Sequence, residues 1–141
     1  MDARLIFWPA IAMAALTLVI WVMMYRRRIA EMKRERIHPQ SIHNRALVAE
    51  RLKDCRASDN FQNLFELPVL FYVALVVAFL SAQVNWLTLS LAWAFVALRI
   101  AHSYIQCTYN KVMHRFYAYL AGGWALWLLW GVLAFGLLRN L

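Results

Sequence analysis

Charged residues are scarce in this sequence: they make up 16% of its 141 residues, and only seven of them are acidic. Alternation of polar and apolar residues is also absent, and an unclosed sheet would leave backbone groups unsatisfied in lipid, so strands are not expected. Internal repeats and low-complexity segments are absent as well. What the chain has instead is 64% hydrophobic residues, arranged in continuous blocks. This composition indicates an integral membrane protein.

Each of four apolar blocks is close to the roughly 20 residues that a membrane-crossing helix needs. We therefore predict a single domain over residues 1–141, an all-α membrane protein built as a four-helix up-and-down bundle, because the links between the last three blocks are short. Pro68 is expected to kink the second helix. The predicted helices are Leu5 to Tyr25, Phe61 to Ala82, Trp86 to Ile105 and Phe116 to Leu138.

Basic residues are concentrated on one side of this arrangement. All except Arg4 and Arg139 fall in 26–56 or in 99–115, so the positive-inside rule makes that side cytoplasmic and both termini external. Residues 26–56 are then a cytoplasmic loop with a turn at His38 to Ser41. The first block is followed by the basic cluster and has no small-residue cleavage site, so we expect it to stay in the mature chain.

The formal charge of +8 raises the question of nucleic acid. The basic residues flank membrane spans and form no base-reading motif, so we expect no nucleic-acid partner. Anionic lipid headgroups are the expected partner of the basic patch on and after the first helix. The patch is Arg26, Arg27, Arg28, Lys33, Arg34 and Arg36.

Cysteine is nearly absent, with only Cys55 and Cys107 present. Both fall on the predicted cytoplasmic side, where thiols stay reduced, and neither has a second cysteine at metal-ligand spacing. We expect neither a disulfide nor a metal site. Lys53 and Arg56 could lower the pKa of Cys55 and make it catalytic, although an incidental cysteine is the favoured interpretation.

Arg99 is the most informative single residue, because it lies within an otherwise apolar run and His102, Ser103 and Gln106 follow it on the same helix face. An arginine at membrane depth costs roughly 2.5 to 3.5 kcal/mol on insertion scales, so it indicates a functional site. Alternating helices bring further polar residues to the same cytoplasmic end. These are Arg26 on the first helix, Arg56, Asn60, Asn63 and Glu66 on the second, and His114, Arg115 and Tyr119 on the fourth.

An arginine-rich cluster with few carboxylates suits an anionic ligand that enters from the cytoplasm. Alternatives remain open at three places. Glu66 could simply pair with Arg99 and tie two helices together. His102 could be a general base, but donation to a carbonyl of a neighbouring helix is favoured. Arg115 and Tyr119 could stabilise a thiolate or oxyanion, or be a snorkelling arginine with an interface tyrosine.

Over nearly the whole chain these motifs resemble the MAPEG family, the membrane-associated proteins in eicosanoid and glutathione metabolism, and most closely a bacterial branch. The resemblance implies homotrimers in the bacterial inner membrane, with glutathione bound between subunits near the cytoplasmic face. It implies that Arg115 stabilises the glutathione thiolate with Tyr119. The residues expected to bind glutathione are Arg26, Arg56, Asn60, Asn63, Glu66, Arg99, His102, Ser103 and Gln106. The motifs are Arg56 to Asn60, Asn60 to Pro68, Arg99 to Ser103 and Tyr109 to Tyr117.

Two positions depart from the enzymes of that family. Three residues after Asn60 the enzymes carry Glu, whereas this chain has Asn63 and places its acid at Glu66. Seven residues after Arg99 they carry Tyr, whereas this chain has Gln106. Two hypotheses follow: a glutathione-dependent transferase or peroxidase acting on lipophilic electrophiles, and a non-catalytic trimer that holds a lipid or anion. A transporter ranks third, because no polar path crosses the external half.

Overall fold

The computed structural model describes residues 1–139, apart from the side chains of Arg45 and Ala49; the last two residues of the predicted domain, 140–141, lie outside the described residues. Every regular element in the described part is helical. Four segments are long and apolar enough to cross a membrane: Ala3–Arg34, Arg56–Leu80, Trp86–Cys107 and Val112–Arg139. The predicted all-α bundle with four spans is thus confirmed.

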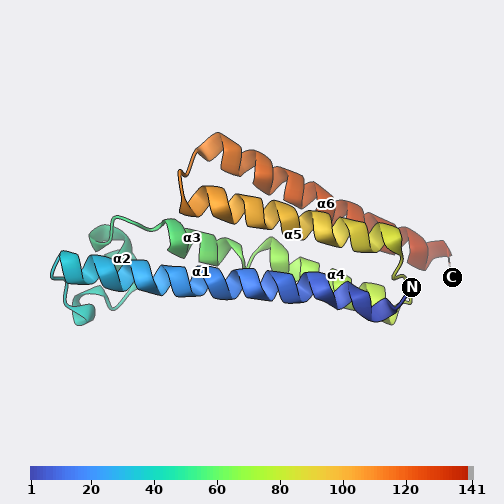
Figure 1. The fold of residues 1–141 in the computed structure, drawn as a ribbon, viewed down its shortest axis with the longest axis horizontal. Helices are drawn as coiled ribbons and strands as arrows, with labels where there is room; N and C mark the ends of the chain where they lie inside the picture. Colours follow the sequence, from blue (N-terminus) through green and yellow to red (C-terminus); the bar gives the residue numbers. More distant parts are fainter. Residues whose placement is uncertain (140–141) are drawn as a thin grey trace.

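In Figure 1 the long helix α1 (Phe7–Arg34) lies alongside α3 (Arg56–Asn63) and α4 (Leu67–Leu80), while α5 (Trp86–Cys107) and α6 (Val112–Arg139) form a second pair above them. The N-terminal 3₁₀ turn Ala3–Ile6 precedes α1. Both termini lie at the same end of the bundle, and the polar connection between α1 and α3 lies at the other. An even number of spans produces this arrangement.

The first helix is longer than predicted. It continues past Tyr25 through the basic segment and ends at Arg34, because arginine, lysine and glutamate are good helix formers and no proline intervenes before Pro39. Arg36 then adopts a left-handed conformation (φ 54°) that turns the chain. The predicted loop over 26–56 is corrected accordingly: it begins only after Arg34.

The remaining connection contains a 3₁₀ turn, Pro39–Ile42, and a short helix, α2 (Arg45–Arg51). Asn44 caps α2, with its side chain accepting a hydrogen bond from the Leu47 N–H at 2.9 Å. The predicted turn around Pro39 is therefore present, and the segment after it is partly helical.

The second predicted helix is broken in two. Residues 64–66 separate α3 from α4, and Pro68 lies in the first turn of α4. Proline has no N–H to continue a helix and its ring clashes with the preceding turn, so it favours the start of a helix at this point and destabilises a helix that continues through it. The predicted kink is thus a complete interruption, and it leaves the Asn63 carbonyl at the end of α3 available to a partner from another helix.

The α5–α6 pair forms the framework of the site. α5 begins with a capping box, in which Asn85 and Thr88 satisfy each other's backbone N–H groups. α6 begins after a turn in which Asn110 is left-handed (φ 48°). The two helices approach closely at Gly122, where an added Cβ atom would lie 3.7 Å from Leu98 Cβ and 3.9 Å from Arg99 Cδ.

A large side chain at Gly122 is expected to destabilise the protein, because it would push α6 away from α5 beside Arg99. Gly122→Leu should cost about 1 to 3 kcal/mol, the usual range for overpacking, and lower the melting temperature in detergent. Gly131→Leu is the matched control, since nothing lies within 4 Å of a Cβ added there. Equal melting temperatures for the two variants would contradict the prediction, because they would show that the α5–α6 contact can accommodate a larger side chain at Gly122.

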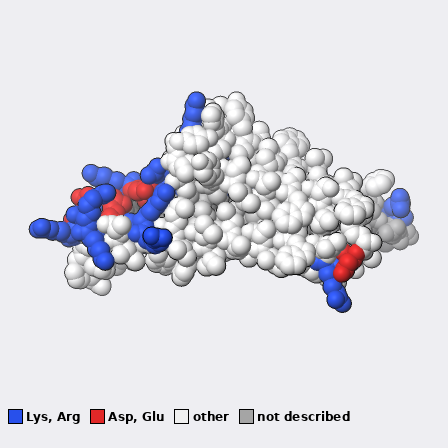
Figure 2. All heavy atoms as spheres, viewed as in Figure 1, with Lys and Arg blue, Asp and Glu red and all other residues white. Residues whose placement is uncertain are grey.

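Charge is segregated along the long axis of the molecule. Figure 2 shows basic and acidic side chains crowded at the end that carries α2, whereas the central part of the visible face is almost free of charge. Large apolar side chains are exposed along the helices there, among them Leu18, Trp93, Leu128 and Phe135. Such a continuous apolar exterior is what a lipid-facing surface requires.

Candidate functional site

Arg99 is buried in the middle of the bundle with 1% of its surface exposed. Its Nη2 donates to the Asn63 carbonyl at 3.0 Å, the group left available by the break between α3 and α4. Its guanidinium carbon lies 5.0 Å from the centre of the Tyr119 ring and 5.7 Å from that of Phe95. The two aromatic faces stabilise the cation.

Two of the three guanidinium nitrogens of Arg99, Nε and Nη1, are buried and have no hydrogen-bond partner. Glu66, the proposed partner, is exposed at the residue before α4, and no ion pair joins it to Arg99 among the described residues. The hypothesis of a structural Glu66–Arg99 bridge is therefore wrong. A buried cation with unused donors is costly, so an anion that reached Nε and Nη1 of Arg99 would stabilise it.

A chain of hydrogen bonds joins α3, α5 and α6 beside Arg99. The Asn63 Nδ2 donates to Gln106 Oε1 at 3.2 Å, and His102 Nε2 lies 2.9 Å from the same oxygen. On its other side, His102 Nδ1 donates to the Arg115 carbonyl at 3.1 Å. This contact fits the favoured interpretation of His102, donation to a carbonyl of a neighbouring helix, and each ring nitrogen lies within hydrogen-bond distance of an oxygen.

A second, fully buried cluster lies one turn away. Ser103 Oγ donates to Asn60 Oδ1 at 3.2 Å, and Asn60 Nδ2 donates to Cys107 Sγ at 3.5 Å. Asn60 is completely inaccessible. The hydrogen bond between Asn60 and Ser103 therefore joins α3 to α5 in the interior of the bundle.

The cavity itself has a volume of about 340 Å³ and brings together five of the predicted site residues. Arg99 lies directly behind it, because its contacts, Tyr119 and Asn63, are both lining residues. Three lining residues were not predicted from the sequence: Asp59, Val112 and Phe116. Asp59 precedes Asn63 by four residues on the same helix face, and that spacing is a signal from which it could have been predicted. The predicted residues that line the cavity are Asn63, His102, Gln106, Arg115 and Tyr119.

Arg115 reaches the cavity from the first turns of α6. It is half-buried, and its Nη1 donates to Asn110 Oδ1 at 2.9 Å in the turn before the helix. Tyr119 follows one turn later, with its ring centre 5.6 Å from that of His102. A cation and a phenol thus line the same wall, where they can stabilise a developing negative charge.

Four predicted residues lie away from the cavity. Glu66 is exposed, as described above, and exposed His114 lies with its Nδ1 3.2 Å from the Tyr109 hydroxyl. Arg26 lines a separate apolar hollow on the outer side of α1. Arg56 donates to Asp54 at 2.8 Å and to the Thr108 carbonyl at 2.7 Å. Arg27 makes a similar contact, because its Nη2 donates to the Cys107 carbonyl at 2.7 Å. Arg27 was not among the site residues predicted from the sequence. Two arginines therefore cap the carboxyl end of α5, where the helix dipole favours cations.

Asp54 forms ion pairs with both Arg27 and Arg56, and its backbone N–H donates to Glu31. Asp54 lies 3.6 Å from Arg27 Nη1 in an ion pair, and buried Glu31 accepts hydrogen bonds from the backbone N–H groups of Lys53 (2.7 Å) and Asp54 (3.3 Å). Hydrogen bonding from the Arg56 side chain lowers the pKa of Asp54 below its usual value. This network anchors the connection between α1 and α3 to the end of α5.

Asp54→Asn is expected to make the stability of the protein less sensitive to acid. A carboxyl group with a depressed folded-state pKa stabilises the fold above its unfolded pKa of roughly 3.9, and this stabilisation is lost as the pH falls through the folded value. Melting temperatures measured between about pH 6 and pH 3 should therefore fall less steeply for Asp54→Asn than for the wild type. Glu35→Gln, which removes only an exposed pair with Arg34, is the control and should follow the wild type; parallel curves for all three would contradict the prediction.

The cysteines are both free thiols. Burial raises the pKa of Cys55 above its usual value, and the nearby carboxylates of Asp59, Glu31 and Asp54 add to the effect. The suggestion that Lys53 and Arg56 activate Cys55 is therefore wrong: Arg56 is occupied by Asp54. In the part of the chain that the structure describes, no group of three His, Cys, Asp or Glu residues could hold a metal ion.

Comparison with known families decides what kind of bundle this is. The family model for MAPEG matches residues 6–135, nearly the whole chain. The chain belongs to the MAPEG family. No curated protein and no solved structure matches it. Together with its four apolar spans, the match makes this MAPEG protein a multi-pass membrane protein.

Proposed function

We propose that this MAPEG protein is a glutathione-dependent transferase or peroxidase that acts on lipophilic electrophiles or hydroperoxides. The observation that carries the proposal is the Arg99 guanidinium, which is buried beside a cavity with two nitrogens unpartnered. MAPEG proteins generally use glutathione, a peptide with two carboxylates. A carboxylate is the natural partner of an arginine fork, which offers parallel donors.

The residues around the cavity fit such a peptide. Arg99 lies behind the lining with Nε and Nη1 buried, so it would donate to a carboxylate once the lining side chains shift, and the Asn63 and Gln106 amides would hydrogen-bond to peptide groups. Asp59 lines the same cavity and is the group there that would accept a hydrogen bond from an ammonium. The volume of about 340 Å³ lies at the lower end of the roughly 300 to 1,000 Å³ typical of ligand sites.

Arg115 and Tyr119 would carry the chemistry. Glutathione supplies a thiol, and a free thiol with a pKa of about 8.5 is mostly protonated at neutral pH. The Arg115 guanidinium would stabilise the thiolate electrostatically, and the Tyr119 hydroxyl would donate a hydrogen bond to it. His102, whose ring lies between Gln106 and the Arg115 carbonyl, would position Gln106 and the start of α6, leaving proton transfer to solvent.

An apolar hollow adjoins the cavity and suits the second substrate. It has a volume of about 350 Å³, shares Tyr119 with the polar cavity, and continues over Leu67, Leu120 and Trp124 on the outer face of the bundle. A lipophilic electrophile could enter it from the bilayer without crossing water. The shared Tyr119 would then stand between the thiol and the electrophile.

Arg26 and Glu66, which lie away from the cavity, would take part in the site if the protein assembles into a trimer. MAPEG proteins are generally trimers, and we propose a homotrimer in a bacterial inner membrane, with both termini external and the basic end cytoplasmic. In such a trimer Arg26, on the outer side of α1, would contact glutathione held by the neighbouring subunit. Glu66, exposed before α4, would also be available to it.

A calorimetric titration of the purified protein with glutathione tests the proposal, with thiolate absorbance recorded in parallel. We expect binding together with a new thiolate signal at neutral pH. The matched control ligand is the same tripeptide with alanine in place of cysteine, which should bind without the signal. Absence of binding for both ligands would exclude a glutathione enzyme.

A second candidate is a non-catalytic trimer that holds a lipid or another anion. It is supported by the polar contacts that the cavity residues already make within the protein. Asn63 and His102 both contact Gln106, and Arg115 donates to Asn110. It predicts that no thiolate forms and that no electrophile is turned over, even where an anion binds at Arg99.

A further inference from the structure

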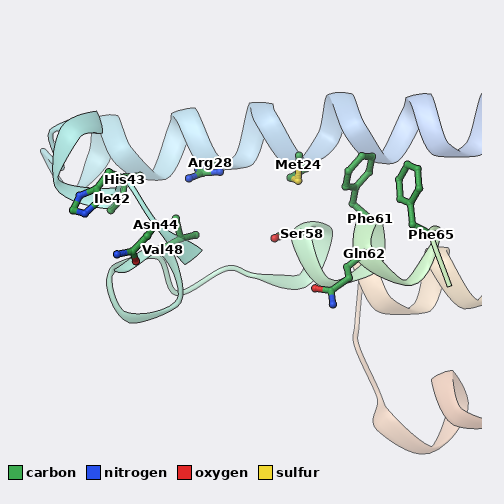
Figure 3. A pocket seen from close by; sticks show the side chains of 10 residues that line it. All are labelled: Met24, Arg28, Ile42, His43, Asn44, Val48, Ser58, Phe61, Gln62 and Phe65. Carbon is green, nitrogen blue, oxygen red and sulfur yellow. The ribbon is translucent and has the colours of Figure 1, made fainter. Parts of the chain in front are cut away.

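A second cavity, of about 510 Å³, lies between α1, the connection that follows it, and α3 (Figure 3). None of the residues that line it belongs to the site described above. Met24 and Arg28 line it from α1, four residues apart and hence on one helix face. Met24 belongs to the apolar part of α1 and Arg28 to the basic part, so the cavity straddles the boundary between the lipid-facing and charged regions.

The end of the cavity nearer α2 carries its one charged side chain, Arg28. Figure 3 shows His43 and Asn44 at this end as well, with the apolar side chains of Ile42 and Val48 beside them. The Arg28 side chain is half-buried, and no hydrogen bond or ion pair to it occurs among the described residues. No carboxylate is among the described residues that line the cavity, so the charge of this part of the lining is positive.

The other end is mainly aromatic. Phe61 and Phe65 lie side by side there, with ring centres 5.0 Å apart in an edge-on arrangement, and the Gln62 side chain lies next to Phe61. Phe65 belongs to the link between α3 and α4, and 58% of its surface is exposed. Its exposure makes a soluble anion a poor match for the whole cavity, because an apolar surface of this kind is best covered by hydrocarbon.

We propose that this cavity binds one anionic glycerophospholipid, with the phosphate at Arg28 and an acyl chain over Phe61 and Phe65. The polarity runs in the required direction: the cationic end points toward the charged end of the molecule seen in Figure 2, and the aromatic end toward the uncharged middle. An arginine near the membrane surface attracts an anionic headgroup with about 1 kcal/mol. The proposal does not depend on glutathione binding.

Native mass spectrometry of the full-length protein, released from vesicles of equal parts phosphatidylglycerol and phosphatidylcholine, tests it. The wild type should retain one phosphatidylglycerol in preference to phosphatidylcholine. Arg28→Gln should reduce that retention about fivefold, and Arg28→Lys should keep most of it. Arg34→Gln is the matched control, because it removes the same charge from an exposed position outside the cavity, and it should behave as the wild type.

A second variant separates a lipid from a soluble anion. Phe65→Ser should weaken retention of phosphatidylglycerol, and an excess of inorganic phosphate should not displace the lipid from the wild type. Displacement by inorganic phosphate would mean that the cavity binds a free anion, and would overturn the proposal. Equal retention of the two lipids, or equal losses of lipid in Arg28→Gln and Arg34→Gln, would also overturn the proposal. A change of oligomeric state in Arg28→Gln without retained lipid would overturn it too, because it would identify a second copy of the chain as the occupant of the cavity.

Discussion

Arg99→Met is expected to weaken glutathione binding by about 100-fold or more while leaving the melting temperature unchanged or higher. The binding loss follows because methionine fills the same space but cannot donate to a carboxylate. The stability follows because Arg99 is buried with two unpartnered nitrogens, and replacing a poorly compensated buried charge with an apolar side chain is commonly neutral or stabilising. Calorimetric titration and thermal unfolding of one preparation measure both quantities.

The opposite signs of the two effects make the Arg99 variant decisive. If the bond to the Asn63 carbonyl and the contacts with Phe95 and Tyr119 stabilise the fold by more than the two unpartnered nitrogens destabilise it, Arg99 is structural, and the substitution would lower the melting temperature. Arg139→Met, in the exposed last turn of α6, is the control for loss of one positive charge and should change neither quantity. A large fall in melting temperature with unchanged binding would reject the ligand role of Arg99.

The sequence was sufficient for the number of spans and for the importance of Arg99. Continuous apolar blocks can satisfy their backbone in lipid only as helices, and an arginine within such a block costs enough to demand an explanation. Spacing along a helix also placed His102 and Gln106 beside it, because residues three, four and seven apart share a face. These inferences need no knowledge of how the helices pack.

The residues with which the site arginines and Glu31 interact could be identified only from the tertiary structure. Adjacent helical residues point about 100° apart, so whether Arg26 or Arg27 faces α5 depends on the rotation of α1, which the sequence pattern does not fix. The partner of Arg99 depended likewise on the break after Asn63, which exposes a backbone carbonyl and leaves Glu66 at the surface. Glu31 was overlooked because its partners are backbone N–H groups of Lys53 and Asp54, and backbone groups leave no trace in a sequence pattern.

Arg115→Met is expected to lower the turnover number for glutathione conjugation by about 10² to 10³-fold, the usual effect of removing one electrostatic stabiliser of developing charge. Glutathione affinity should change much less, because Arg99 and the amides of Asn63 and Gln106 would still hold the peptide. The thiolate absorbance at neutral pH should disappear, and activity should recover as the pH approaches the ordinary thiol pKa of about 8.5. Steady-state kinetics across pH, with absorbance on the same samples, measure all three effects.

Lys111→Met is the matched control for Arg115, because it removes a positive charge from an exposed residue in the turn just before α6. It should leave both turnover and thiolate absorbance unchanged. Arg115→Lys should retain part of the activity, since a point charge still stabilises a thiolate although it lacks the planar fork. If Arg115→Met and Lys111→Met behave alike, Arg115 is a snorkelling arginine at the membrane boundary, and the bond to Asn110 is its whole function.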